Sequence, residues 1–400
     1  MGAPLKLLHT SDWHLGKKLF KLERLPEQER FLGELLEIIK REGVHHLLVA
    51  GDIFDVPQPP HRALRVFYDF IATLTATTNC EMWVIGGNHD SGTLLDAPAA
   101  LIDESRIHLF GGLRADASEH WVKLPLPSGT AHLDLCLLPY FRHHELAPWR
   151  GDIDVTQPGW PEELVRRFLA TIPSGASAGR IIMAHHLFGM FEAAGSEQAL
   201  ALSGMDSIPL DWLASFDYAA LGHIHKPQTL RKQKPFVRYC GSPIAMRFSE
   251  TAPKGVELLS WDEHGLSNST LPLKTWRPLL SLQLTQESWK KSVEDIAPSE
   301  LPAAVEIYLK LKAPVPGLVE EIRLNCERRG LELLSVMPQF ELEDKKDAKE
   351  NWTTLLKLTP EELFNSFYLS KFPEEAEVPT DLAQDMRQLW EEARRAPPST

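Results

Sequence analysis

The chain has 400 residues, of which 43% are hydrophobic and 24% are charged, which is typical of a globular protein. No apolar run approaches the ~18 residues of a membrane span, and the start lacks a secretory signal, so we expect a cytoplasmic protein. The net charge of −13 argues against a protein that holds nucleic acid with a broad basic face of its own. The four cysteines are far apart, which favours neither a disulfide framework nor a zinc knuckle.

The first quarter of the chain predicts alternating strands and helices. A strand over Leu5–Thr10 is followed by a helical apolar spacing over Pro26–Glu42, and a buried strand over Leu47–Ala50 comes next. Pro59-Pro60 opens a second amphipathic helix, and Glu81–Ile85 forms a third strand. This βαβαβ order is typical of an α/β layered domain.

Ligand-type side chains follow each of these three strands. Asp12 and His14 come after the first strand and Asp52 after the second. The third strand runs into Gly86-Gly87-Asn88-His89-Asp90. Asp12 and His14 are two residues apart, so on an extended segment both side chains would leave on the same side. We expect the two glycines to turn the backbone with positive φ.

Two later strands end in the same way. Arg180–Ala184 runs into His185-His186, and Tyr218–Leu221 runs into Gly222-His223-Ile224-His225. Since adjacent residues of a strand face opposite sides, we expect only one of His185 and His186 to be a ligand.

Taken one at a time, these residues are best explained as caps, turns, or ordinary surface or core residues, and we expect His45 and His46 to be solvated or packing residues. Five strand ends with ligand chemistry favour a metal site instead. Its donors are carboxylate, amide and imidazole groups without thiolate, which suits manganese, iron or zinc, and Asp52 is the best bridge between two ions. The candidates are Asp12, His14, Asp52, Asn88, His89, His186, His223 and His225.

The chain changes in character after Leu273. Five segments predict a small β-α-β-α-β module, and a charged linker over Glu341–Glu350 then precedes two helical segments, Thr359–Ser370 and Asp381–Arg395. The five segments are Leu279–Leu284, Gln286–Ile296, Val305–Leu311, Gly317–Arg329 and Leu331–Met337.

The ordered set Asp-x-His, Gly-Asp, Gly-Asn-His-Asp, a strand-terminal His and Gly-His-x-His resembles the calcineurin-like metallophosphoesterase superfamily over about residues 5 to 260. The resemblance implies an α/β fold: a two-sheet β-sandwich flanked by helices, with a dinuclear metal centre at its edge. It implies that Asp12, His14, Asp52 and His225 hold one metal, and that Asp52, Asn88, His186 and His223 hold the other. His89, oriented by Asp90, would face the scissile phosphate and assist the leaving oxygen.

Several longer phrases are similar to the SbcD family of nuclease subunits, which work with the ATPase SbcC. The phrases are His9–Gly16, Ala50–Asp55, Ala220–His225, Arg238–Pro243 and Leu358–Phe364. This resemblance implies a metallophosphoesterase nuclease domain over 1–272, a small α+β capping domain over 273–340, a linker over 341–354 and C-terminal helices over 355–400 that dock SbcC.

The same resemblance implies a Mn²⁺-dependent hydrolase with two divalent ions. Its expected activities are a 3′ to 5′ exonuclease on double-stranded DNA and an endonuclease on single-stranded or hairpin DNA, in DNA repair, recombination and replication. It also implies a homodimer within a heterotetramer with SbcC. Apolar residues on the helix after Pro60 and on Thr93–Ile102 are candidates for the subunit contact, and core packing explains each of them equally well.

Two other functions remain open at this stage. A small-molecule phosphodiesterase of the same superfamily would leave the capping domain and tail without a role, and a catalytically inactive scaffold is disfavoured by the complete ligand set. A protein phosphatase is disfavoured because Val56-Pro57 follows Asp55, and Gly86 precedes Gly87-Asn88, where that branch carries arginines.

Overall fold

The computed structural model describes residues 3–99, 106–127, 129, 131–154, 156–157, 159–173, 175–192 and 207–340, with isolated positions between 364 and 386. The expected linker over 341–354 lies outside the described residues, as does most of the tail over 355–400. Among the described helices, none is long and apolar enough to cross a membrane. The four cysteines are unpaired and buried.

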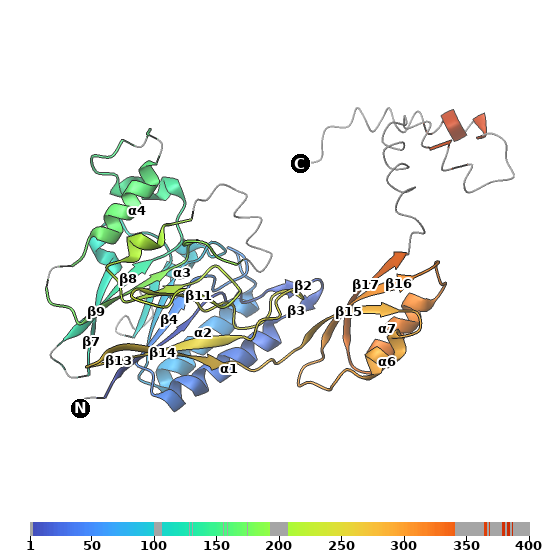
Figure 1. The fold of residues 1–400 in the computed structure, drawn as a ribbon, viewed down its shortest axis with the longest axis horizontal. Coiled ribbons are helices and arrows are strands. Elements are labelled where there is room, and N and C mark those ends of the chain that lie inside the picture. Colours follow the sequence, from blue (N-terminus) through green and yellow to red (C-terminus); the bar gives the residue numbers. More distant parts are fainter. Residues whose placement is uncertain are drawn as a thin grey trace. The chain divides into compact units, whose positions relative to one another are not determined.

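Two six-stranded sheets form the main body (Figure 1). The first has the order β14-β13-β1-β4-β5-β6, in which β1, β4, β5 and β6 are parallel and β13 and β14 are antiparallel. Its strands are β1 (Leu5–Thr10), β4 (His46–Ala50), β5 (Glu81–Ile85), β6 (Ile107–Phe110), β13 (Gly255–Asp262) and β14 (Gly265–Pro272).

The second sheet has the order β11-β12-β10-β9-β8-β7, with β8, β9, β10 and β12 parallel and the two edge strands antiparallel. Its strands are β7 (Trp121–Pro125), β8 (His132–Leu138), β9 (Gly179–Ala184), β10 (Tyr218–Leu221), β11 (Gln228–Arg231) and β12 (Phe236–Tyr239). The short pair β2 (Lys18–Leu19) and β3 (Leu22–Glu23) forms a separate hairpin.

The alternation of side chains along the buried strands explains why two sheets stack. On β1, Leu7 lies in the cluster between the sheets, whereas Leu8 lies in the cluster under the helices. On β9, Ile181 and Met183 likewise face the inter-sheet cluster, whereas Ile182 faces the outer one. Each strand thus buries both faces, as parallel strands in layered α/β folds do. The expected two-sheet sandwich flanked by helices is confirmed.

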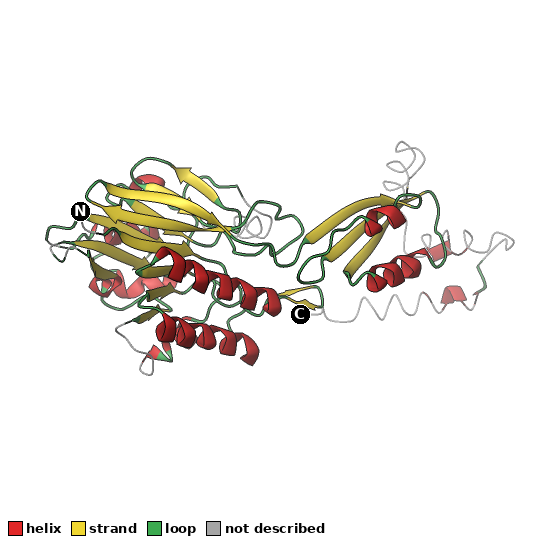
Figure 2. Cartoon of the chain, turned by 90° about the horizontal axis from the view of Figure 1, so that it is seen from below, coloured by secondary structure: helices red, strands yellow, loops and turns green. Residues whose placement is uncertain are grey.

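Helices cover the outer faces of both sheets (Figure 2). The two longest are α1 (Leu25–Glu42) and α2 (His61–Thr77), and they pack with the first sheet in one cluster. Proline in the first turn favours the start of α1, and Gly43, at φ 64°, ends it in the left-handed conformation. Further helical segments are α3 (Gly92–Asp96), α4 (Trp160–Ala170), η2 (Ala117–His120), η3 (His143–Trp149) and η4 (Leu210–Leu213).

The apolar residues on one face of α2 belong to the core, whereas Leu64, Val66 and Tyr68 are only partly buried. Phe67, Phe70 and Leu74 are buried, and the Trp13 ring contacts Phe67 and Phe70 edge to face. Core packing is therefore the explanation that holds for these side chains, and they are not free to form a subunit contact.

A three-stranded sheet of order β15-β16-β17 follows the sandwich in the chain. Its strands are β15 (Leu279–Thr285), β16 (Ala304–Leu311) and β17 (Glu332–Phe340), accompanied by α6 (Trp289–Glu294) and α7 (Leu318–Arg328) (Figure 1). The predicted order of strands and helices matches, although α6 is shorter than the expected helix over Gln286–Ile296.

Candidate metal centre

The loops after β1, β4, β5, β9 and β10 converge at the carboxyl ends of the parallel strands. Backbone and side-chain bonds join the two sheets there: the His223 amide donates to Asp12 Oδ1 at 2.9 Å, and His185 Nδ1 lies 2.7 Å from the Ala50 carbonyl oxygen. A Cβ at Gly222 would overlap the Ala50 carbonyl, so only glycine permits this approach. This edge is where ligands of α/β sheets bind.

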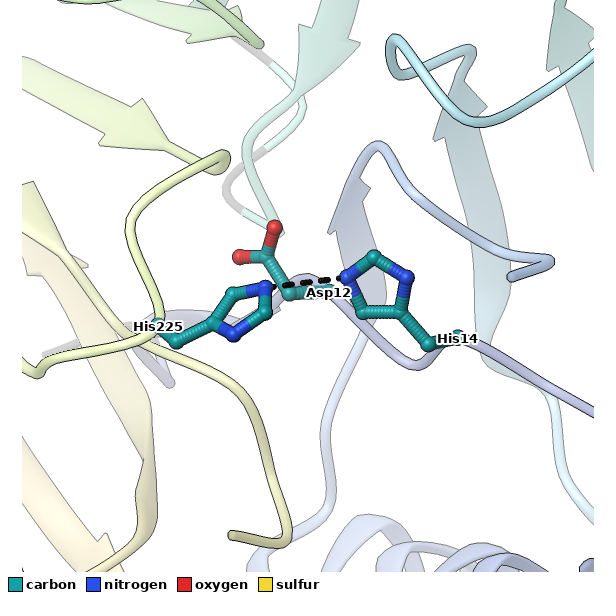
Figure 3. Close-up of side chains that lie close together, drawn as sticks. All are labelled: Asp12, His14 and His225. Atoms are coloured by element: carbon teal, nitrogen blue, oxygen red, sulfur yellow. Dashed lines mark hydrogen bonds between the residues drawn. The ribbon is translucent and has the colours of Figure 1, made fainter. Parts of the chain in front are cut away.

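One group of ligand atoms comes from Asp12, His14 and His225 (Figure 3). The two imidazoles meet with their Nε2 atoms 3.0 Å apart, beside the Asp12 carboxylate. All three residues are buried. Burial lowers the pKa of His14, although the Asp52 carboxylate opposes the shift, and an imidazole that has lost its proton can offer a lone pair to a metal.

Asp52 lies between this group and a second one. Its Oδ2 is 3.4 Å from His14 Nε2, and its Oδ1 is 3.4 Å from His185 Nε2. Burial raises the pKa of Asp52, but the charges of His185 and His14 outweigh that effect and hold the pKa well below its ordinary value. An ionised carboxylate with one oxygen toward each group has the arrangement that a bridging ligand requires.

Asn88 lies at the centre of the second group. Its Oδ1 is 2.7 Å from His223 Nδ1 and 3.1 Å from His185 Nε2. Burial lowers the pKa of His223 well below its ordinary value, with help from the neighbouring His185 charge. For His185, burial lowers the pKa, but the Asp52 carboxylate outweighs it and raises the pKa to about 9.

His185 lies within reach of both Asp52 and Asn88. The His186 Nε2 atom lies 3.2 Å from the Pro139 carbonyl oxygen, and its ring stacks on Tyr140. Among the described residues, three groups of potential ligands lie close enough to hold an ion, and His186 is in none of them. The groups are Asp12, His14 and His225; His14, Asp52 and His89; and Asp12, Asp52 and His185.

His89 is oriented by a backbone carbonyl. Its Nδ1 lies 2.7 Å from the Asp55 carbonyl oxygen, and its ring contacts His14 edge to face. Its amide donates to Asp52 Oδ1 at 2.9 Å. The sequence pattern contained no signal for the Asp55 carbonyl, because a main-chain acceptor carries no residue identity.

Asp90 binds main-chain amides. Its carboxylate accepts hydrogen bonds from Gly87, Ile53 and Phe54 at 2.8 to 3.1 Å, so it ties the loop after β5 to the loop after β4. Burial and the Asp52 charge raise the pKa of Asp90 to about 6, although these amides oppose the rise. No hydrogen bond between the Asp90 and His89 side chains occurs in the described part of the chain.

The backbone of the site differs from the expected one. Asp12, His14, Asp52 and His223 have φ values of 54°, 46°, 52° and 94°, so Asp12 and His14 are in the left-handed region and the expected extended segment is wrong. Such non-glycine conformations cost on the order of 1–3 kcal/mol each and gather at functional sites.

The two glycines before Asn88 also behave differently from the prediction. Neither Gly86 nor Gly87 has positive φ. Instead they permit close approach, since a Cβ at Gly87 would overlap Asp52 Oδ1 and a Cβ at Gly86 would overlap the Gly111 carbonyl.

Carboxylate, amide and imidazole side chains that gather at the edge of a double sheet are typical of a metallophosphoesterase. The sequence profile of the calcineurin-like phosphoesterase family matches residues 5–227, and the chain belongs to that family and is a hydrolase. The donor set contains no thiolate and fits divalent metal ions of borderline or hard character.

SbcD proteins, which are subunits of the nuclease SbcCD, are similar to almost the whole chain. The one from Rhodobacter capsulatus is 30% identical over 90% of this chain and 93% of its own length. The Bacillus subtilis protein is 30% identical over 91% of this chain and 92% of its own length, and the Escherichia coli K12 protein 29% identical over 90% and 92%.

Proposed function

We propose that the chain is the DNA nuclease subunit of an SbcCD-type complex and depends on two divalent ions, with Mn²⁺ as the expected metal. The observation that carries this proposal is the convergence of Asp12, His14, Asp52 and His225 at one buried edge, in a chain similar over about 90% of its length to the SbcD proteins. When bound, the ions would activate water as the nucleophile and offset the charge that develops on the phosphate.

The contacts between these side chains support the ligand set that the family resemblance implies. Asp12, His14 and His225 would hold one ion, Asn88 and His223 the other, and Asp52 both. For the remaining imidazole the family resemblance implies His186, whereas the contacts to Asp52 and Asn88 favour His185. Replacing each histidine singly by alanine decides between them, since only loss of the true ligand lowers the metal content from two ions to one.

His89, carrying a hydrogen on both ring nitrogens, would donate the Nε2 proton to the departing sugar oxygen and keep the Nδ1 hydrogen. Its Nδ1–H is directed at the Asp55 carbonyl, which leaves Nε2 as the ring nitrogen that faces a substrate. Asp90 would act by joining the Asp52 and Asn88 loops through the amides that it binds.

We propose the expected activities as well: 3′ to 5′ exonuclease on duplex ends and endonuclease on single-stranded or hairpin DNA, by a cytoplasmic homodimer that acts with an SbcC-type ATPase. Residues 273–340 would cap the DNA, and the helices over 355–400, after the 341–354 linker, would dock the ATPase. Removing the residues after Leu355 should abolish co-purification with SbcC, and undiminished binding would refute the docking role.

The full chain, freed of metal and then given Mn²⁺, should cleave blunt duplex, hairpin and single-stranded DNA in preference to a chromogenic phosphodiester. The assay is run with and without the ATPase partner. Cleavage of the small diester alone would instead establish the small-molecule phosphodiesterase. Absence of bound or activating metal would establish the inactive scaffold.

A further inference from the structure

The ring nitrogen of His225 that faces away from the candidate centre contacts a buried glutamate. His225 Nε2 points to His14, whereas its Nδ1 lies 3.1 Å from Glu250 Oε1. Both side chains are buried, with 8% and 2% of their surfaces exposed. A carboxylate accepts a hydrogen bond from Nδ1–H, and in a neutral ring with its hydrogen on Nδ1 the lone pair lies on Nε2, toward Asp12 and His14.

Glu250 is itself held by three donors on its other oxygen. Oε2 accepts from Lys254 Nζ at 2.7 Å, from the Met246 amide at 3.1 Å and from Ser242 Oγ at 3.2 Å. Since these donors occupy Oε2, Oε1 is the oxygen directed at His225. The position of the carboxylate is therefore set before any metal binds.

Lys254 connects the same network to the main chain of His225. Its ammonium group donates to the His225 carbonyl at 3.2 Å as well as to Ser242 Oγ at 2.8 Å. The loop between β12 and β13 thus holds His225 at two points, its ring through Glu250 and its backbone through Lys254.

We propose that Glu250 is a positioning residue of the metal centre: it selects the His225 tautomer and fixes the ring so that Nε2 can ligate a metal. The proposal rests on His225 being a ligand, as in the proposed function. Glu250 lies 25 residues beyond His225 in the chain, and none of the strand-end patterns includes it.

The replacement Glu250→Gln tests the tautomer. An amide presents one acceptor and one donor, so if its oxygen stays with the three donors, its NH₂ group faces His225 and forces the proton onto Nε2. If the amide flips, its NH₂ group, a donor, instead faces two other donors, the Lys254 ammonium and the Met246 amide. Loss of such an outer partner weakens metal binding by roughly 10- to 100-fold.

Glu257→Gln is the matched control. Glu257 is also a buried glutamate, and its Oε1 accepts from Arg238 Nε at 2.9 Å and from Thr270 Oγ1 at 2.6 Å, neither of which is a candidate ligand. Glu250→Gln disturbs the ion pair with Lys254, and Glu257→Gln disturbs the ion pair with Arg238. A purely structural effect would therefore lower the Mn²⁺ affinity of both variants alike.

The readouts are Mn²⁺ affinity by calorimetry, the melting temperature of the metal-free protein, and the His225 tautomer by ¹⁵N NMR of histidine-labelled protein. We expect Glu250→Gln to weaken one Mn²⁺ site by roughly 10- to 100-fold and to move the proton to Nε2, with Glu250→Asp restoring part of the affinity and Glu257→Gln changing it less than about twofold.

Wild-type affinity in Glu250→Gln, or an equal loss in Glu257→Gln, would overturn the proposal. These outcomes are distinct from failure of the proposed function. A wild-type chain that binds Mn²⁺ without cleaving DNA refutes the nuclease and leaves the positioning test intact. If His225→Ala retains both sites, His225 is not a ligand and the role of Glu250 falls with it.

Discussion

The buried His9 should make the protein lose stability in mild acid. His9 is fully buried on β1, with Nδ1 3.0 Å from the Tyr218 hydroxyl and Nε2 without a hydrogen-bond partner among the described residues. Burial and the positive charge of Arg238 lower the pKa of His9 from 6.5 to about 3. Glu257 pairs with His9 across the strands β13 and β1, but its carboxylate is bound to Arg238 at 2.7 Å.

The direction of the change in folding stability follows from which state of the chain, folded or unfolded, binds the proton first as the pH falls. His9 takes up its proton below pH 6.5 in the unfolded chain but only near pH 3 in the folded chain. The contribution of neutral His9 to folding stability is therefore complete above pH 6.5 and is lost as the pH falls below that value. Between pH 7 and pH 5 this linkage removes about 2 kcal/mol of folding free energy.

Urea denaturation at pH 7 and pH 5 measures the effect. Wild type should lose about 2 kcal/mol more than His9→Gln over this interval, whereas the exposed replacement His61→Gln should behave as wild type. Equal losses in wild type and His9→Gln would show that His9 does not titrate in this way and would refute the reasoning.

Three further replacements test the packing and the site. Glu27→Ala removes the buried partner of Arg24 and Arg277, whose Nε atoms lie 2.6 and 2.7 Å from Glu27 Oε1. It should lower the unfolding free energy by about 3–5 kcal/mol, measured by urea titration. A loss no larger than that of Glu29→Ala, a replacement at an exposed glutamate, would contradict this. Gly87→Ala places a Cβ on Asp52 Oδ1 and should abolish metal binding in calorimetry. The control Gly33→Ala has open space around its added Cβ and should bind metal as wild type does. Retained metal binding in Gly87→Ala would contradict the explanation that this glycine permits a close approach to Asp52. His89→Gln should lower nuclease turnover by roughly 10²-fold or more with unchanged metal content, and unchanged turnover would remove its catalytic role.

The buried parallel strands were predictable from the sequence. The strand over Leu5–Thr10 is confirmed to the residue, and the observed β4 begins one residue before the predicted Leu47. Strands that bury both faces are continuous apolar runs, and a change to Gly, Asp or His marks where each one ends. For that reason the same pattern also predicted which loops meet at the site.

The antiparallel edges were not predictable in the same way. Strand β14 has the sequence GLSNSTLP and is mostly exposed, so it has no apolar pattern of its own and depends on pairing with β13. The sequence at the strand ends also does not indicate the backbone conformation there. Nothing in Asp12 or His14 indicates positive φ, because their amides bond to the carbonyls of Gly51 and Asp52 only once the sheet has formed.

Long-range partners of the site have no local signal either. The Asp55 carbonyl behind His89 is a main-chain atom, and Glu250 reaches His225 from a loop that resembles any polar turn. Likewise, periodicity could place His185 and His186 on opposite faces, but only the packed sheets direct His185 to Asp52.

Asp52 provides the most direct test of the central claim, because its two oxygens are directed at the two groups of ligand atoms. The metal content of the full chain and of Asp52→Asn, measured with duplex DNA cleavage in Mn²⁺, is compared with the exposed control Asp69→Asn. We predict that wild type and control bind two ions per chain and cleave DNA. We predict that Asp52→Asn loses both the two-ion content and the cleavage. Cleavage by wild type in the presence of a chelator, or an Asp52→Asn variant that retains two ions and full turnover, would contradict it.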